Sequence, residues 1–256
     1  ETIIRDVYNK EDVAFSELDR KFITAFERYL KETRGLARNT TAKYFECFRK
    51  VLKVAQQKGW MEHGKFLEEL GRLCVKEETS PSFLNWDELR TVMETDLPAG
   101  RLERVKDVFV FCALTGLSYQ GISTLCPSHL FRDDEGTLWI CRTRAEGAEI
   151  GDSCTSRVPL LKPAMVLLEK YRGWNPMNPE GPCFPVPSVQ KMNEYLKEVS
   201  ALCRISKRLT TQMARNTFAA TVTLANRIPK EHVGEMLGYS SDYMLRHYMQ
   251  AQERNS

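Results

Sequence analysis

The chain has 256 residues, of which 42% are hydrophobic, and this is enough apolar material for one large core or for a small and a medium domain. Its formal net charge is only +3, which permits a nucleic-acid partner without demanding one. No run approaches the roughly 20 apolar residues of a membrane span, and the N-terminus lacks the apolar run of a signal peptide. The chain begins at Glu1 rather than at a methionine, which is compatible with a fragment of a longer protein.

The eight cysteines are scattered along the chain without a C-x-x-C pair. This pattern fits reduced thiols in a cytosolic protein better than a disulfide framework. The four histidines show no ligand spacing relative to the cysteines, so we expect no structural zinc site.

The first part of the chain, residues 16–75, has the apolar spacing of helices. One helix is expected to end at Gly35, and a second to begin with Asn39 or Thr40 as its cap and to end at Gly59. A short helix is expected over 65–74. The sequence therefore predicts a compact helical bundle.

The polar stretch "KEETSPSF", residues 76–83, contains a Ser-Pro step and is typical of a connection between domains. We therefore expect a first domain over 1–78, a linker over 79–84 and a second domain over 85–256.

Beyond the linker, "NWDELRTVMETDL" predicts a helix capped by Asn85, and "RVKDVFVFCALTG" predicts a central helix buried on several sides. Strand character is confined to 138–140 and 158–161, which we expect to pair as a small antiparallel hairpin. The remaining helices are expected over 162–173, 188–203, 210–225, 229–237 and 241–252. The predicted fold class is mainly α with a small antiparallel β hairpin or sheet.

Basic residues concentrate between Arg28 and Lys58, where nine lysines and arginines face only two acidic residues. Such a face can bind DNA phosphates and release condensed counterions, and a helix N-terminus in this segment would add free N–H groups. A solvated charged helix face is the alternative interpretation. The expected DNA-contacting residues are Arg38, Asn39, Thr40, Lys43 and Lys50, with Arg208 from a second basic cluster in the other domain.

Four ordered stretches of the second domain carry a resemblance to the tyrosine recombinases, also called the phage-integrase family. They are "LTGLSYQGISTL", "LTTQMARNTFAATV", "VGEMLGYSS" and "LRHYMQ", and "LARNTTAKY" in the first domain resembles the family's core-binding domain. The chain looks closest to the integrases of Bacteroides-type mobile elements. The resemblance implies a helical core-binding domain and a catalytic-type domain that close as a clamp on double-stranded DNA, with four protomers in the reacting complex.

The family's chemistry implies the roles of two residues. Tyr248 matches the nucleophile, whose oxygen attacks a phosphodiester and forms a 3′-phosphotyrosyl bond, and Arg215 matches the second phosphate-binding arginine. Because the covalent link conserves the phosphodiester, the resemblance implies neither cofactor nor metal.

At the other family positions the sequence departs from the usual residues. Ser118 stands where the first arginine belongs, Gly121 replaces the acidic residue of that box, Gln212 and Asn216 replace two histidines, and Tyr239 replaces a late histidine or tryptophan. The hairpin lacks the general-acid lysine, and only Arg142 and Arg144 lie near the place expected for it, with Arg144 as the candidate stand-in. Ser118, Arg144, Gln212 and Tyr239 are therefore either helpers or relics.

Two hypotheses follow. In the first, the protein is an integrase-like recombinase in which Tyr248 still breaks and rejoins DNA strands. In the second, it is a DNA-binding relative that has lost cleavage and acts as an accessory or regulatory factor. We expect a bacterial, cytoplasmic, nucleoid-associated protein with no membrane partner and no small-molecule substrate. A scaffold without a DNA role is a third alternative.

Overall fold

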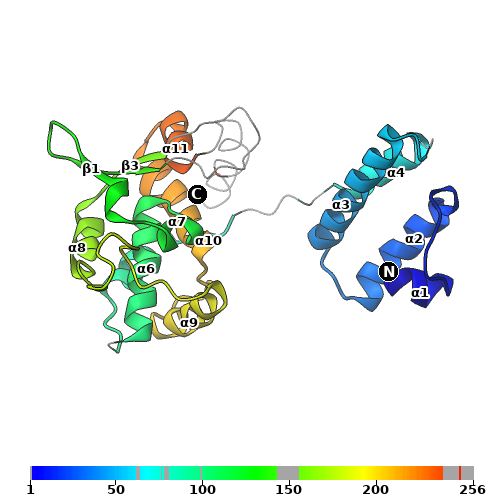
Figure 1. Ribbon diagram of the computed structural model, residues 1–256. Coiled ribbons are helices and arrows are strands. Elements are labelled where there is room, and N and C mark those ends of the chain that lie inside the picture. The colour runs from blue at the N-terminus through cyan, green and yellow to red at the C-terminus, as the bar shows by residue number, and fades with distance from the viewer. Residues whose placement is uncertain are drawn as a thin grey trace. The chain divides into compact units, whose positions relative to one another are not determined.

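The computed structural model describes residues 2–61, 64–75, 77, 81–98, 100–142, 156–238 and 248 (Figure 1). The chain divides into two compact units, residues 1–79 and 80–256. The described parts are mostly helical and contain one three-stranded antiparallel sheet, which confirms the predicted fold class.

The first unit is a small helical bundle. Its elements are α1 (Thr2–Tyr8), η1 (Phe15–Glu17), α2 (Arg20–Arg28), η2 (Tyr29–Thr33), α3 (Arg38–Gln57) and α4 (Gly64–Leu73). The Asp19 carboxylate begins α2 by accepting a 2.9 Å hydrogen bond from the Phe22 N–H. The Phe26 ring packs edge-on against Phe45 with centroids 5.3 Å apart, and both rings belong to the unit's core.

The start of α3 differs from the expected one. The helix begins at Arg38 with Ala37 at the cap position, and no side chain caps it. Asn39 already lies inside the helix. Its side-chain amide does not cap the helix but exchanges two hydrogen bonds with the backbone of Glu77. The helix over Thr2–Tyr8 was not anticipated.

The second unit surrounds one buried helix. Its helices are α5 (Trp86–Glu94), α6 (Arg101–Thr115), α7 (Tyr119–Ser123), η3 (Pro127–His129), α8 (Lys162–Lys170), α9 (Val189–Leu202), α10 (Thr211–Thr217), η4 (Phe218–Thr223), η5 (Leu224–Asn226) and α11 (Lys230–Leu237). In Figure 1, α6 runs through the middle of this unit, and it contacts α5, α8, α9 and α10. Every residue from Val105 to Thr115 is buried, as the continuous apolar run predicts. Asn85 caps α5 with a full capping box, as expected.

The sheet consists of β1 (Leu130–Arg132), β2 (Leu138–Arg142) and β3 (Ser156–Pro159) in the order β1-β2-β3. Ile140 lies opposite Leu130 on one side and Val158 on the other, so its buried side chain attaches the sheet to the core. The expected pairing of the second and third strands is present. The first strand, only three residues long, was missed.

A buried carboxylate fixes α8 to α6. Asp107, 4% exposed, accepts hydrogen bonds from the Lys170 ammonium at 2.6 Å and from the Tyr171 hydroxyl at 2.9 Å. Lys170 also contacts Glu103 at 2.5 Å. Burial of Lys170 lowers its pKa, but the hydrogen bonds and charges of Asp107 and Glu103 outweigh burial and raise it. The hydrogen bond from Lys170 lowers the pKa of Glu103.

Replacing Lys170 with methionine should therefore lower the free energy of unfolding at pH 7 by about 2–3 kcal/mol, because Asp107 would stay buried without its cation. Urea unfolding measures the loss, and Lys162→Met, an exposed lysine of the same helix, is the matched control. The difference in unfolding free energy between the wild type and Lys170→Met should be largest at neutral pH. It should fade in acid as Glu103 is protonated, and in alkali as pH rises through the raised pKa of Lys170. Equal losses in both variants would contradict this account.

Candidate functional site

Arg215 lies on α10 and is held by the ends of two other helices. Its guanidinium donates hydrogen bonds to the backbone oxygens of Gly116 and Leu237. Gly116 is the C-cap of α6 and Leu237 is the last residue of α11, so both oxygens lie at the partly negative ends of helix dipoles. The side chain remains partly exposed. Its position is therefore fixed by the junction of three helices.

That junction depends on a glycine. Gly116 ends α6 in the left-handed conformation, at φ 71°, which glycine adopts without steric cost. A Cβ at this position would lie 2.6 Å from the Phe218 ring and 2.8 Å from a methyl carbon of Leu237. The absence of a side chain thus lets the end of α6 come close enough for its carbonyl to reach Arg215.

Tyr248 is fully buried, and its hydroxyl donates a 3.1 Å hydrogen bond to Oδ1 of Asn216. Asn216 directly follows Arg215 on α10. Gln212, one turn earlier, donates its Nε2 to the same oxygen at 3.1 Å. The structure therefore brings Tyr248 and Gln212 together at Asn216, on the helix that also carries Arg215.

The other end of the Asn216 amide holds the beginning of the second unit. Its Nδ2 donates to the backbone oxygen of Ser82 at 3.0 Å, and the Thr217 hydroxyl accepts from the Leu84 N–H at 3.0 Å. Leu84 is completely buried in the core. The expected linker over 79–84 therefore includes residues that the second unit holds firmly by hydrogen bonds and by burial.

Ser118 and Gly121 lie on α7. The Ser118 hydroxyl caps this helix by accepting from the Gly121 N–H at 3.1 Å. The backbone oxygen of Gly121 accepts a hydrogen bond from Arg142 of β2, which also donates to the Thr124 hydroxyl at 2.8 Å. A Cβ on Gly121 would be 3.1 Å from Arg142 Nη1. Arg142 thus occupies space beside a position that carries no side chain.

Sequence reasoning placed Arg142 and Arg144 near the expected lysine and kept only Arg144 as a candidate. Burial lowers the pKa of the Arg142 guanidinium, but an arginine remains charged at neutral pH. His129 lies nearby, and burial, together with the positive charge of Arg142, lowers the pKa of its imidazole. The signal in the sequence was the glycine at position 121, where the resembling family has an acidic side chain.

Burial also excludes the Cys112 thiol as a nucleophile. Cys112 on α6 is completely buried, and burial raises the pKa of its thiol to about 12 although Arg215 opposes the rise. The thiol stays protonated at neutral pH, so it cannot act as a nucleophile there.

Two expected site residues, Arg144 and Tyr239, lie outside the described residues. The expected helix over 241–252 also lies outside them, apart from Tyr248.

The expected DNA-contacting residues of the first unit fall into two groups. Arg38 forms a 2.5 Å ion pair with Glu77, and Asn39 exchanges hydrogen bonds with the Glu77 backbone. Thr40, Lys43 and Lys50 are exposed on α3, and Lys50 lies 3.7 Å from Glu46. Because these ion pairs are largely exposed, each is weak and a phosphate can displace the carboxylate.

Arg208 of the second basic cluster is exposed just before α10. Its neighbour Lys207 instead donates to the Phe83 backbone oxygen at 3.0 Å and to the Glu88 carboxylate at 2.6 Å. Within this cluster, Arg208 is thus presented to solvent while Lys207 supports the fold.

Among the described residues, no three histidine, cysteine or acidic side chains gather as a metal site. No helix in the described part of the chain is long and apolar enough to cross a membrane.

Comparison with known proteins connects this geometry to a fold. Residues 3–70 match the model of the phage integrase SAM-like domain. A XerH site-specific recombinase bound to a palindromic difH substrate, in a post-cleavage complex, matches with 14% identity and a TM-score of 0.70, covering 99% of this chain and 75% of that one. No curated protein matches the sequence.

Two further solved structures have the same architecture. A lambda integrase dimer bound to a COC′ core site matches with 14% identity and a TM-score of 0.67, covering 98% of this chain and 86% of that one. The Tn1549 transposon integrase in complex with transposon right-end DNA matches with 13% identity and a TM-score of 0.67, covering 99% and 90%. The chain thus carries a phage integrase SAM-like domain and has the fold of the tyrosine recombinases.

Proposed function

We propose that this protein binds double-stranded DNA and breaks and rejoins its strands through a covalent bond to Tyr248. One observation carries the proposal: the Tyr248 hydroxyl is bonded to Asn216, the residue next to Arg215, although 33 and 32 positions separate the tyrosine from Arg215 and Asn216. A phenol and a guanidinium that meet one phosphate are the two groups that attack a phosphodiester and stabilise its charge. The solved recombinases of this fold bound to DNA support the choice of partner.

The phosphate would be held by two guanidinium groups. Arg215 is fixed to Gly116, and Arg142 to Gly121, so both are attached to the short stretch that contains Ser118. Ser118 itself carries no charge and caps α7. We therefore assign the role of the missing first arginine to Arg142, which reaches the same stretch from β2.

The described part of this site offers few groups that can accept or donate a proton, so strand cleavage should be slow. Attack by the Tyr248 oxygen forms a phosphorus–oxygen bond, breaks the bond to the 5′ oxygen and leaves a 3′-phosphotyrosyl link. The phenol must lose a proton and the leaving oxygen must gain one. Asn216 can position the hydroxyl, and Gln212 supports it by donating to the same amide oxygen, but an amide is neither an acid nor a base near neutral pH. Tyr239 and Arg144 remain proposed helpers in this active site, which lacks the usual bases.

A DNA substrate nicked close to the cleavage point tests this proposal, because the short strand released on cleavage diffuses away and traps the adduct. We expect a protein–DNA adduct stable to denaturing electrophoresis with the wild type, and none with Tyr248→Phe, which retains the ring and loses the nucleophile. Equal duplex affinity of both proteins is the control for folding. An adduct that persists in Tyr248→Phe would refute the assignment.

A second function is favoured by the burial of the tyrosine. Tyr248 is 0% exposed and its hydroxyl is occupied by Asn216, as suits a structural side chain. In that case the protein is an accessory or regulatory DNA-binding factor without cleavage. Tight, salt-sensitive duplex binding without any adduct from the nicked substrate would establish this alternative.

The exposed lysines of α3 make DNA binding testable separately from cleavage. Replacing both Lys43 and Lys50 with alanine should reduce the slope of log affinity against log salt by about 1.8, since each phosphate contact contributes about 0.9. Lys10→Ala, a lysine of the same unit that is bound to Glu17, is the control and should leave the slope unchanged. Fluorescence anisotropy of a labelled duplex at several salt concentrations measures both. Identical slopes in all three proteins would place the DNA elsewhere.

The finer parts of the proposal concern setting and assembly. We propose a recombinase of the Bacteroides mobile-element type that works in the bacterial cytoplasm, closes on the duplex as a two-domain clamp, and assembles as four protomers on two duplexes. No cofactor is needed, because the phosphotyrosyl bond keeps the free energy of the phosphodiester.

A further inference from the structure

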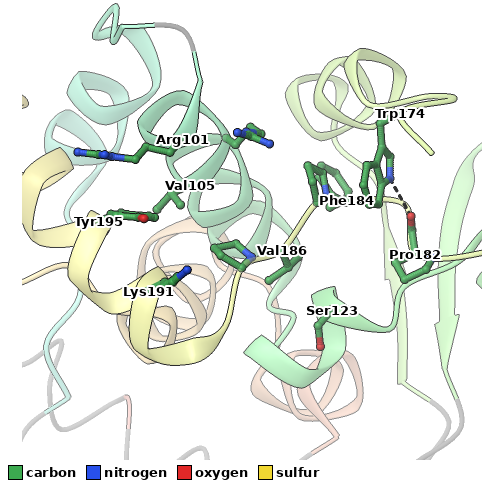
Figure 2. Close-up of a pocket in the computed structure, with 12 residues that line it drawn as sticks. Arg101, Val105, Ser123, Trp174, Pro182, Phe184, Val186, Lys191 and Tyr195 are labelled. Carbon is green, nitrogen blue, oxygen red and sulfur yellow. Dashed lines mark hydrogen bonds between the residues drawn. The ribbon is translucent and has the colours of Figure 1, made fainter.

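The second unit contains a pocket that shares none of its lining residues with the group around Arg215 and Tyr248. Its volume is about 490 Å³, within the range of sites for small molecules (Figure 2). It lies between the start of α6, the end of α7, the start of α9 and the loop that follows α8. The sequence patterns did not indicate it, because its walls come from separated stretches of the chain.

All the charged side chains that line the pocket are positive. Arg101, Arg104 and Lys191 line it, and no acidic side chain does. Arg101 is partly neutralised by Glu198 at 3.4 Å. Within the described part of the chain, neither Arg104 nor Lys191 has a carboxylate within 4 Å, and Figure 2 shows the Lys191 ammonium directed from α9 towards the interior of the pocket. Two cations that the fold leaves without counterions favour a ligand with negative charge.

The apolar walls are flat rings. Trp174 is fixed by a 2.8 Å hydrogen bond from its Nε1 to the backbone oxygen of Pro182, and it keeps 40% of its surface exposed. Phe184 is buried beside it and the two rings share one side of the pocket in Figure 2. On the opposite side the Tyr195 ring is already covered by Arg101, whose guanidinium carbon lies 5.1 Å from the ring centroid. Trp174 is thus the ring best placed to stack on a planar group.

We propose that this pocket binds a mononucleotide, with the phosphates between Arg104 and Lys191 and the base against Trp174. A nucleotide combines the two features that the walls require, an anion of at least one charge and a planar aromatic ring, in a volume that the pocket can hold. None of the residues involved belongs to the proposed cleavage site, so this binding stands whether or not the protein cuts DNA.

Isothermal titration of the whole protein with ADP, adenosine and pyrophosphate tests the proposal. We expect ADP to bind with a dissociation constant of about 10–100 μM, pyrophosphate to bind more weakly, and adenosine to bind at least about tenfold more weakly than ADP. Arg104→Ala and Lys191→Ala should each weaken ADP about tenfold or more, and Arg104→Lys should recover part of the loss. Trp174→Ala should weaken ADP and leave pyrophosphate unchanged.

The chain supplies a matched control. Lys197 lies on the same helix as Lys191 and is equally exposed, but it does not line the pocket. Lys197→Ala should bind ADP as the wild type does. Absence of ADP binding up to about 5 mM, or equal losses in Lys191→Ala and Lys197→Ala, would overturn the proposal.

A short single-stranded oligonucleotide distinguishes a free nucleotide from a nucleotide unit of DNA. If the pocket takes a mononucleotide, ADP should bind in the absence of DNA. Arg104→Ala and Lys191→Ala should then weaken ADP binding without any oligonucleotide present. If only the oligonucleotide binds, and the same two substitutions weaken it, the pocket is part of a strand-binding path and the mononucleotide proposal fails.

Discussion

Gly116→Ala should destabilise the second unit by about 3–5 kcal/mol, because the new methyl group would overlap the Phe218 ring and Leu237 while the backbone stayed in a conformation costly for alanine. A loss of that size removes much of the stability of an ordinary domain. Since Arg215 is bonded to the Gly116 carbonyl, the displacement should also move the guanidinium. Urea unfolding followed by circular dichroism measures the stability.

Gly173→Ala is the matched control. Gly173 has nearly the same backbone conformation, at φ 69°, but nothing lies within 4 Å of the site of its Cβ. It should cost only the backbone strain, about 1 kcal/mol. The difference between the two variants isolates the steric contact. If both variants lose the same free energy, the close approach of α6 to Phe218 and Leu237 is wrong.

Arg142→Ala should slow formation of the covalent adduct on a nicked substrate about 10²- to 10³-fold, because the transition state would lose one of its two proposed cations. Duplex affinity should change much less, since the lost interaction strengthens as charge develops on the phosphate. Single-turnover rates and binding curves measured on the same substrate separate the two effects. Arg142→Lys should restore part of the rate by returning the charge without the planar fork.

The control for Arg142 is another arginine of the same sheet. Arg157 lies on β3, is exposed, and pairs in register with Cys141. Arg157→Ala should react at nearly the wild-type rate. Because Arg142 also holds Gly121 and Thr124, thermal unfolding of each variant shows whether a slow rate reflects chemistry or a loosened α7. A normal rate in Arg142→Ala would remove this residue from the site.

The parts of the fold that were predictable from the sequence are those set by local patterns. The continuous apolar run of α6 predicts a buried helix, and Asn85 with Glu88 three residues later predicts the start of α5. The sequence could not show that Asn39 leaves the N-terminus of α3 uncapped, because its amide pairs with Glu77, which is 38 positions away. A local rule has no access to such a partner.

Irregular helical turns were also beyond local patterns. The expected helix over 210–225 is regular only to Thr217 and then passes through a wider turn. Threonine hydroxyls there bond back to the backbone: Thr217 to the Met213 oxygen at 2.8 Å and Thr223 to the Ala219 oxygen at 2.7 Å. These bonds compete with the regular helical ladder. Periodicity of apolar residues does not report this competition.

For the site, motif spacing selected Tyr248, Gln212 and Arg215, and the structure brings the first two together at Asn216 of α10. The sequence placed Arg142 near the expected lysine but could not show that it contacts Gly121. Its contact with Gly121 joins residues 21 positions apart in different elements. The glycine at position 121 leaves space for this side chain, but a glycine alone does not say which group fills that space.

The side-chain amide of Asn216 is shared by the phenol and by the connecting segment. Its oxygen faces Tyr248 while its nitrogen faces Ser82, so one rotation about the side chain would break both bonds. Breaking this pair of hydrogen bonds costs about 1–3 kcal/mol. Any tension that draws Ser82 away lowers that cost. The segment that begins the second unit is thus tied, through one amide, to the residue that carries the phenol.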